Sequence, residues 1–142
     1  MTTLSLDAIL SLPAGRELDA LVAEKVMGLS VEDYRYPMGW KRGKAHSWAE
    51  EDVVLWGNIL CILNPDGTRK LLDDGFHVVV PYYSTSIAAA WELVIKLDKY
   101  VFAVSRSYRG WYGDFSLEET HIGLADTAPL AICRAALKAV MG

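Results

Sequence analysis

Two short segments of this sequence combine positively charged side chains, aromatic rings and glycines. Residues 34–48 hold four of the 14 Lys and Arg residues together with four Trp or Tyr residues, and residues 106–112 repeat the pattern. Guanidinium and ammonium groups bind phosphate, whereas flat aromatic faces stack on a purine-like ring. Glycine lets backbone N–H groups approach an anion closely. The two segments therefore predict a site for a phosphorylated, nucleotide-like small molecule.

The first segment supplies five candidate ligand residues. We predict that Arg35, Lys41 and Arg42 bind phosphate groups. We predict that Tyr36 and Trp40 stack on a ring of the ligand.

The second segment supplies four more candidates. Arg106 and Arg109 are the predicted phosphate partners, and Trp111 and Tyr112 are the predicted stacking partners. A structural role is the alternative for both segments, because Trp and Tyr also serve as core anchors or dimer contacts. The sequence leaves the two interpretations open.

A helix start at residues 84–86 is a further anion candidate. Free N–H groups at a helix N-terminus bind anions, so we include Ser84 among the predicted ligand residues. Capping of the helix by these hydroxyl groups explains the same residues without a ligand.

Motifs for catalysis and for metal binding are absent from the sequence. It has no Walker loop, no Gly-x-Ser-x-Gly elbow, no His-Glu-x-x-His pair and no dinucleotide-binding glycine pattern. His46, His77 and His121 are widely separated, and the acidic runs at 50–52 and 73–74 are typical of solvated faces. We therefore predict no cofactor, no metal and no catalytic residue.

Composition limits the class of protein. The chain has 142 residues, of which 52% are hydrophobic, and a formal net charge of −4, so we expect one domain over residues 1–142. The negative charge argues against binding to duplex nucleic acid. No run approaches the roughly 20 apolar residues that span a bilayer, so we expect no membrane segment. Residues 1–4 have no basic character and the two cysteines form no CxxC pair, which favours the cytoplasm.

Three helices and several strands must position the candidate residues. Apolar residues at helical spacing predict helices over 16–27 and 87–99, and a third that starts at 126–129 and carries an apolar stripe through Val140. Strands are predicted over 53–63 and 76–80, with a hairpin that pairs 100–105 with 111–115. Residues 30–52 are predicted to form a loop with at most one short strand. This order predicts an α+β domain in which helices cover a mostly antiparallel sheet.

Three segments, 12–27, 81–92 and 125–137, together resemble the phage ABA sandwich domain, a family of small phage and prophage proteins. The resemblance implies a layered α-β-α sandwich and no assigned catalytic motif. Residues 30–80 match the family pattern least well.

A phage origin implies an accessory protein in the cytosol of the host bacterium. One mode of action known for such proteins is a sponge, a homo-oligomer that sequesters a nucleotide-derived immune signal, such as the ADP-ribose-derived signals of Thoeris defence. Two alternatives stay open: a protein-interaction module that inhibits a host protein, and a weak phosphodiesterase-type hydrolase.

Overall fold

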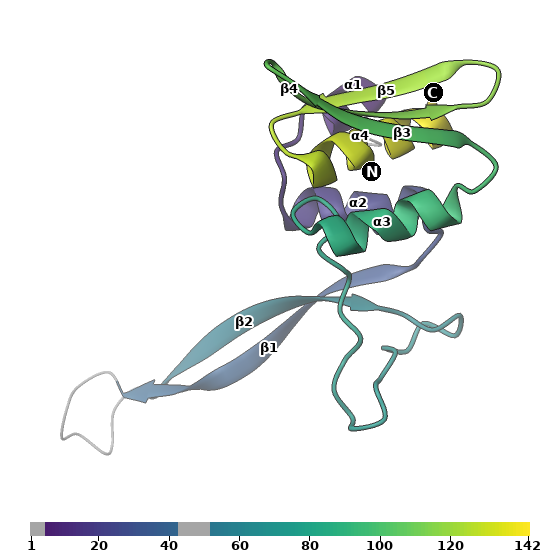
Figure 1. Ribbon diagram of the computed structural model, residues 1–142. Coiled ribbons are helices and arrows are strands. Elements are labelled where there is room, and N and C mark those ends of the chain that lie inside the picture. Colours follow the sequence, from purple (N-terminus) through teal and green to yellow (C-terminus); the bar gives the residue numbers. More distant parts are fainter. Residues whose placement is uncertain (1–4, 43–51) are drawn as a thin grey trace. The chain divides into compact units, whose positions relative to one another are not determined.

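The computed structural model describes residues 5–42 and 52–142, which contain four helices and five strands. The chain divides into two compact units. We call residues 1–31 and 80–142 the helix-sheet unit and residues 32–79 the hairpin unit (Figure 1). The expectation of a single domain stays a prediction, and each unit is described by itself.

The sheet of the helix-sheet unit has three antiparallel strands in the order β3-β4-β5. They are β3 (Val101–Ser107), β4 (Gly110–Ser116) and β5 (Thr120–Ala125). The predicted hairpin at 100–105 and 111–115 is confirmed as β3 and β4. The sequence analysis did not predict β5, in which Gly123 interrupts the apolar pattern.

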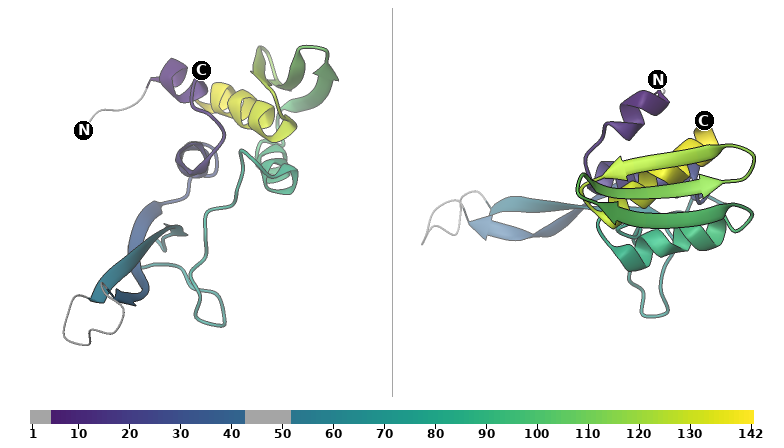
Figure 2. Two further views of the ribbon diagram at one scale, coloured as in Figure 1. Left: turned by 90° about the vertical axis from the view of Figure 1, so that its left-hand side faces the viewer. Right: turned by 45° about the horizontal axis from the view of Figure 1, so that its top comes forward.

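Four helices complete this unit: α1 (Leu6–Leu10), α2 (Arg16–Lys25), α3 (Ile87–Lys96) and α4 (Ala128–Met141). Helix α4 packs against one face of the sheet, and α1, α2 and α3 each pack against α4 (Figure 2). The three predicted helices are confirmed as α2, α3 and α4. Helix α1 has only five residues, which is too short for a periodic pattern to reveal it.

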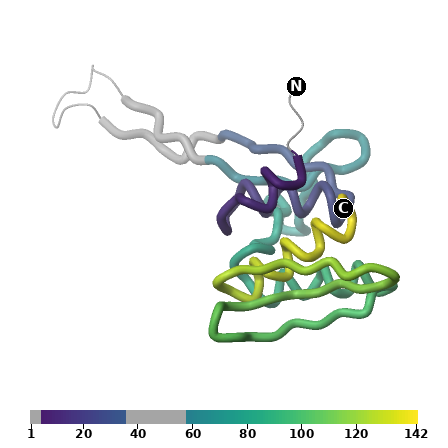
Figure 3. Tube along the Cα trace, turned by 90° about the horizontal axis from the view of Figure 1, so that it is seen from above, coloured from purple at the N-terminus to yellow at the C-terminus, as the bar shows by residue number. Residues whose placement is uncertain are grey.

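Helix α4 lies close to the sheet because small residues line the contact. A Cβ on Gly113 would lie 3.3 Å from the Ala131 carbonyl oxygen and from the Ile132 Cα. A Cβ on Gly123 would collide with the Ala131 carbonyl and the Ala135 backbone nitrogen. In Figure 3 the three strands run side by side along the helix.

The hairpin unit contains a two-stranded sheet of β1 (Val31–Arg42) and β2 (Asp52–Ile62). The strand predicted over 53–63 is confirmed as β2. The loop predicted over 30–52 is wrong for 31–42, which form one long strand that includes Pro37. Each strand of a two-stranded sheet has an open edge, where a proline without an N–H group is tolerated.

The strand predicted over 76–80 is wrong. In this region the structure has only isolated bridges, Leu71 with His77 and Cys61 with Val79. The α+β class itself is confirmed by the four helices and the antiparallel strands.

Candidate functional site

The turn between β3 and β4 is held in place by its own backbone and by Ser107. The Ser107 hydroxyl accepts a hydrogen bond from the Arg109 N–H at 3.2 Å and donates one to the Gly110 carbonyl at 3.4 Å. Gly110 has a φ of +124°, and a Cβ there would lie 2.7 Å from the Ala125 carbonyl oxygen. Only glycine fits this position without strain, so the turn holds the residues on either side in defined places.

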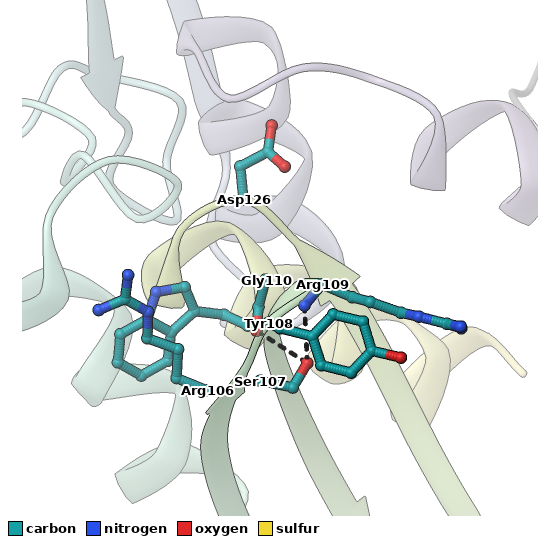
Figure 4. A pocket seen from close by; sticks show the side chains of 7 residues that line it. Arg106, Ser107, Tyr108, Arg109, Gly110 and Asp126 are labelled. Atoms are coloured by element: carbon teal, nitrogen blue, oxygen red, sulfur yellow. Dashed lines mark hydrogen bonds between the residues drawn. The ribbon is translucent and has the colours of Figure 1, made fainter.

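A pocket of 620 Å³ opens beside this turn. This volume lies within the range of small-molecule sites. The pocket is lined by Arg106, Ser107, Tyr108, Arg109, Gly110, Trp111 and Asp126 (Figure 4). The structure thus brings together three of the predicted ligand residues: Arg106, Arg109 and Trp111.

Arg106 and Trp111 are the two pocket residues that pair directly across strands β3 and β4. They face each other as partners in the β3–β4 register, so a guanidinium group and an indole ring start from adjacent positions on one face of the sheet. Arg106 is exposed and Trp111 is half-buried. Tyr112 follows Trp111 in β4, points to the opposite face because side chains alternate along a strand, and is not among the lining residues.

Arg109 lies apart from Arg106. The two side chains extend from the turn in opposite directions (Figure 4). The Arg109 guanidinium lies 5.3 Å from the centroid of the Tyr108 ring, and this ring is 92% exposed. The structure therefore does not place both guanidinium groups at one phosphate position.

Asp126 gives the pocket an acidic group. It follows β5 and precedes α4, and its carboxylate lies across the turn from the two arginines (Figure 4). The sequence predicted Asp126 at the start of a helix and not as a ligand residue. With two arginines and one carboxylate, the pocket keeps a net charge of +1.

The structure corrects the assignment of Ser84 as a ligand residue. Ser84 is fully buried; its N–H and its hydroxyl donate to the Asp19 carboxylate at 2.8 and 2.6 Å. The same hydroxyl oxygen accepts from the Gly15 N–H at 2.9 Å. Helix α3 begins two residues later than this assignment requires, with Ser86 as its N-cap. Ser84 therefore connects parts of the fold and is closed to a ligand.

The other predicted ligand residues belong to the hairpin unit. Arg35 is an exposed residue of β1. Tyr36, Trp40, Lys41 and Arg42 lie in the same strand, but their side chains are outside the described residues, so their roles stay predictions.

Near these residues, Tyr34 has partners within the hairpin unit. The Arg69 guanidinium lies 3.6 Å from the centroid of its ring, and the His77 ring packs against it edge-on at 5.4 Å. Arg69 also forms an ion pair of 2.8 Å with Glu32. These contacts give Tyr34 the structural role that the sequence analysis left open for this segment.

Within residues 5–42 and 52–142, no group of three His, Cys, Asp or Glu residues is close enough to hold a metal ion. His46 lies outside the described residues. Cys61 and Cys133 are buried and unpaired, and burial raises the pKa of both thiols. In the described part of the chain, no helix is long and apolar enough to cross a membrane.

Comparison with known proteins identifies the family. The model of the phage ABA sandwich domain matches residues 20–137. A solved structure, the 2.0 Å crystal structure of a phage protein from Bacillus cereus ATCC 14579, matches over 100% of both chains with a TM-score of 0.57 and 19% identity. This likeness shows the fold. A search of curated proteins gives no match.

Proposed function

Because the chain belongs to the phage ABA sandwich domain family, we propose that it is a phage accessory protein that binds a phosphorylated, nucleotide-like small molecule without converting it. The binding site is the pocket at the β3–β4 turn. The observation that carries the proposal is the pairing of Arg106 with Trp111 across the two strands at the wall of this pocket.

The pair matches the two parts of a nucleotide. The Arg106 guanidinium is exposed and donates hydrogen bonds to phosphate oxygens in a forked geometry. The Trp111 indole offers an aromatic face to a purine-like ring. Arg109, on the other side of the turn, binds a second charged group of a ligand long enough to span it.

Asp126 fits a ligand that carries sugar hydroxyl groups. A carboxylate accepts hydrogen bonds from a ribose in dinucleotide-binding folds. A free inorganic anion would be repelled by this carboxylate and would have no ribose hydroxyl groups to donate hydrogen bonds to it. The pocket therefore favours a nucleotide over a bare phosphate.

We place this binding in an anti-defence role. A homo-oligomer that holds an ADP-ribose-derived immune signal, such as a Thoeris signal, removes it from the host effector by mass action. Sequestration needs affinity and abundance but no catalytic group.

Isothermal titration calorimetry with ADP-ribose, cyclic ADP-ribose and cyclic dinucleotides tests the proposal. We expect one class of these ligands to bind, and Arg106→Ala to weaken that binding about tenfold to a hundredfold, because a charge-assisted hydrogen bond contributes about 1.5–3 kcal/mol. Lys96→Ala is the control, since it removes an exposed cation of α3 that is not among the residues lining the pocket.

Three outcomes would contradict the proposal. If none of these ligands gives a heat of binding, the proposed class of ligand is wrong. If Arg106→Ala and Lys96→Ala weaken binding equally, the pocket at the β3–β4 turn is not the binding site. If chromatography shows that the protein converts a ligand to a product, the alternative of a phosphodiesterase-type hydrolase is favoured.

A further inference from the structure

Strand β3 is an open edge of the three-stranded sheet. In an antiparallel ladder every second residue bonds to the neighbouring strand, so half of the N–H and C=O groups of β3 point away from β4. Natural edge strands are protected by charged side chains, of which lysine is the most frequent, by proline, by a bulge or by short length. β3 has seven residues, Val-Phe-Ala-Val-Ser-Arg-Ser, and has neither lysine nor proline. Among the described residues, no strand pairs with this edge.

The opposite edge strand, β5, has a hydrogen bond to another part of the chain. The Arg134 guanidinium of α4 donates to the Leu124 carbonyl of β5 at 2.7 Å and to the Leu12 carbonyl at 3.2 Å. Leu10 of α1 and Leu124 line the same small pocket beside it. A side chain of the fold therefore bonds to one carbonyl of the β5 edge strand, whereas no such hydrogen bond reaches β3 from elsewhere in the described residues.

An apolar stripe on α3 lies next to the open edge. Ile87, Trp91 and Ile95 recur every four residues and are 52%, 47% and 65% exposed. The Trp91 ring packs edge-on against Phe102 of β3 at 5.7 Å. Val101, the first residue of β3, is 73% exposed. The stripe therefore adjoins β3 through the contact of Trp91 with Phe102, and Val101 projects from the opposite face of the sheet.

We propose that this surface, formed by the β3 edge and the α3 stripe, binds a second copy of the chain about a two-fold axis. Antiparallel pairing of β3 with its own copy matches the two strands in length and satisfies the outward backbone groups of both. The same axis gives the α3 stripe of each copy an apolar partner. Closed two-fold dimers are the commonest soluble oligomers.

Charge also favours a second copy as the occupant. The only charged residue of β3 is Arg106, at one end of the strand. Antiparallel pairing places the two Arg106 residues at opposite ends of the ladder, so that like charges do not meet. This inference rests on the proposed function, for which it specifies the surface that forms the homo-oligomer. Of the residues that carry it, only Arg106 also lines the pocket.

Sedimentation equilibrium and hydrogen exchange test the inference on the full chain without ligand. We expect a species with twice the 15.7 kDa mass of the chain, and a population that rises with concentration. Amide exchange in β3 should slow as the dimer forms, while exchange in β5 stays unchanged. Ile95→Lys should raise the dimer dissociation constant at least tenfold, because it places a charge in the stripe.

Leu124→Lys is the matched control, because Leu124 is 67% exposed and lies on the other edge strand. A chain that stays monomeric at every concentration contradicts the inference. The inference is also contradicted if the two lysine variants raise the dimer dissociation constant equally. It is contradicted as well if amide exchange in β3 does not depend on protein concentration. Circular dichroism checks that the variants fold; Ile87→Lys replaces Ile95→Lys if the latter does not. If the chain stays monomeric but binds the ligand, the dimer surface is refuted and the proposed ligand pocket is not.

Discussion

At the scale of single residues, Asp19 joins helix α2 to the segment at residues 80–84. Its carboxylate accepts two hydrogen bonds from Ser84 and one from Arg16, and it is fully buried. Arg16 also donates to the Val80 carbonyl at 2.7 Å. As a charged residue of a predicted amphipathic helix, Asp19 would be expected on the solvent face, but its main partner, Ser84, lies 65 residues away. Helical periodicity cannot show such a partner.

Asp19→Ala should lower the free energy of unfolding by about 3 kcal/mol. The substitution leaves the Ser84 N–H buried without an acceptor and removes the partner of Arg16. Glu24→Ala, at an exposed position of the same helix, should change stability by less than about 0.5 kcal/mol. Urea unfolding measures both, and similar losses would show that the Asp19 contacts do not stabilise the fold.

Tyr83 should make the fold sensitive to alkaline pH. Burial, reinforced by the Glu92 carboxylate, raises its pKa from 10 to about 12. Between pH 10 and pH 12 the unfolded chain ionises this phenol and the folded chain does not, so stability falls as pH rises. The phenol should account for a loss of about 2 kcal/mol over this window.

Tyr83→Phe isolates this contribution from the other groups that titrate at high pH. The unfolding free energy of the wild type minus that of this variant should be constant below pH 10 and should fall between pH 10 and pH 12. Urea unfolding at a series of pH values measures it. A difference independent of pH contradicts the account of Tyr83.

Arg106, Arg109 and Trp111 could be found from the sequence because they lie within six residues of one hairpin. Asp126 was not predicted as a pocket residue, because its place beside the turn depends on the pairing of β5 with β4. Ser84 was assigned wrongly, because its exposure depends on Asp19 in a distant helix. Local patterns therefore identified the pocket residues of the hairpin and missed the pocket residue that tertiary contacts supply.

At the scale of elements, the approach of α4 to the sheet depends on small residues. The sequence of α4 is rich in alanine, which permits close packing, but the strand that α4 contacts, β5, was not predicted. The glycine that weakened the strand pattern is required at the point where the helix backbone crosses β5. Gly123 therefore explains both why β5 was not predicted from the sequence and why α4 can pack closely against it.

Gly123→Ala should lower the free energy of unfolding by about 3 kcal/mol, the upper end of the usual cost of overpacking. The added methyl group would collide with backbone atoms of α4, which cannot move as a side chain does. Gly113→Ala should cost less, since its nearest contacts would be 3.3 Å. Thermal or urea unfolding ranks the two variants, and an equal or reversed order would contradict the proposed packing.

The long strand β1 shows a different limit of local patterns. Pro37 and Gly39 predicted a loop, because both residues are uncommon inside sheets. In the structure they lie in a strand of a two-stranded sheet, where an open edge accepts them. Without the number of strands in the sheet, the sequence could not distinguish a loop from such an edge.

At the scale of the whole molecule, the two predicted binding segments belong to different units. The second segment forms a pocket within the helix-sheet unit alone. The account of function therefore depends on the β3–β4 turn, and the candidates of the hairpin unit are a separate prediction. A net charge of −4 for the chain is compatible with this, because the pocket itself is positive.

Recovery of bound ligand tests the central claim most directly. The wild-type chain and the Arg106→Ala variant are incubated with an ADP-ribose-type ligand, freed of excess ligand and denatured, and the released small molecules are identified by mass spectrometry. The account predicts that the wild type releases the intact ligand in near-equimolar amount and that the variant releases much less. Release of no ligand, of a hydrolysed product, or of equal amounts from both chains would contradict it.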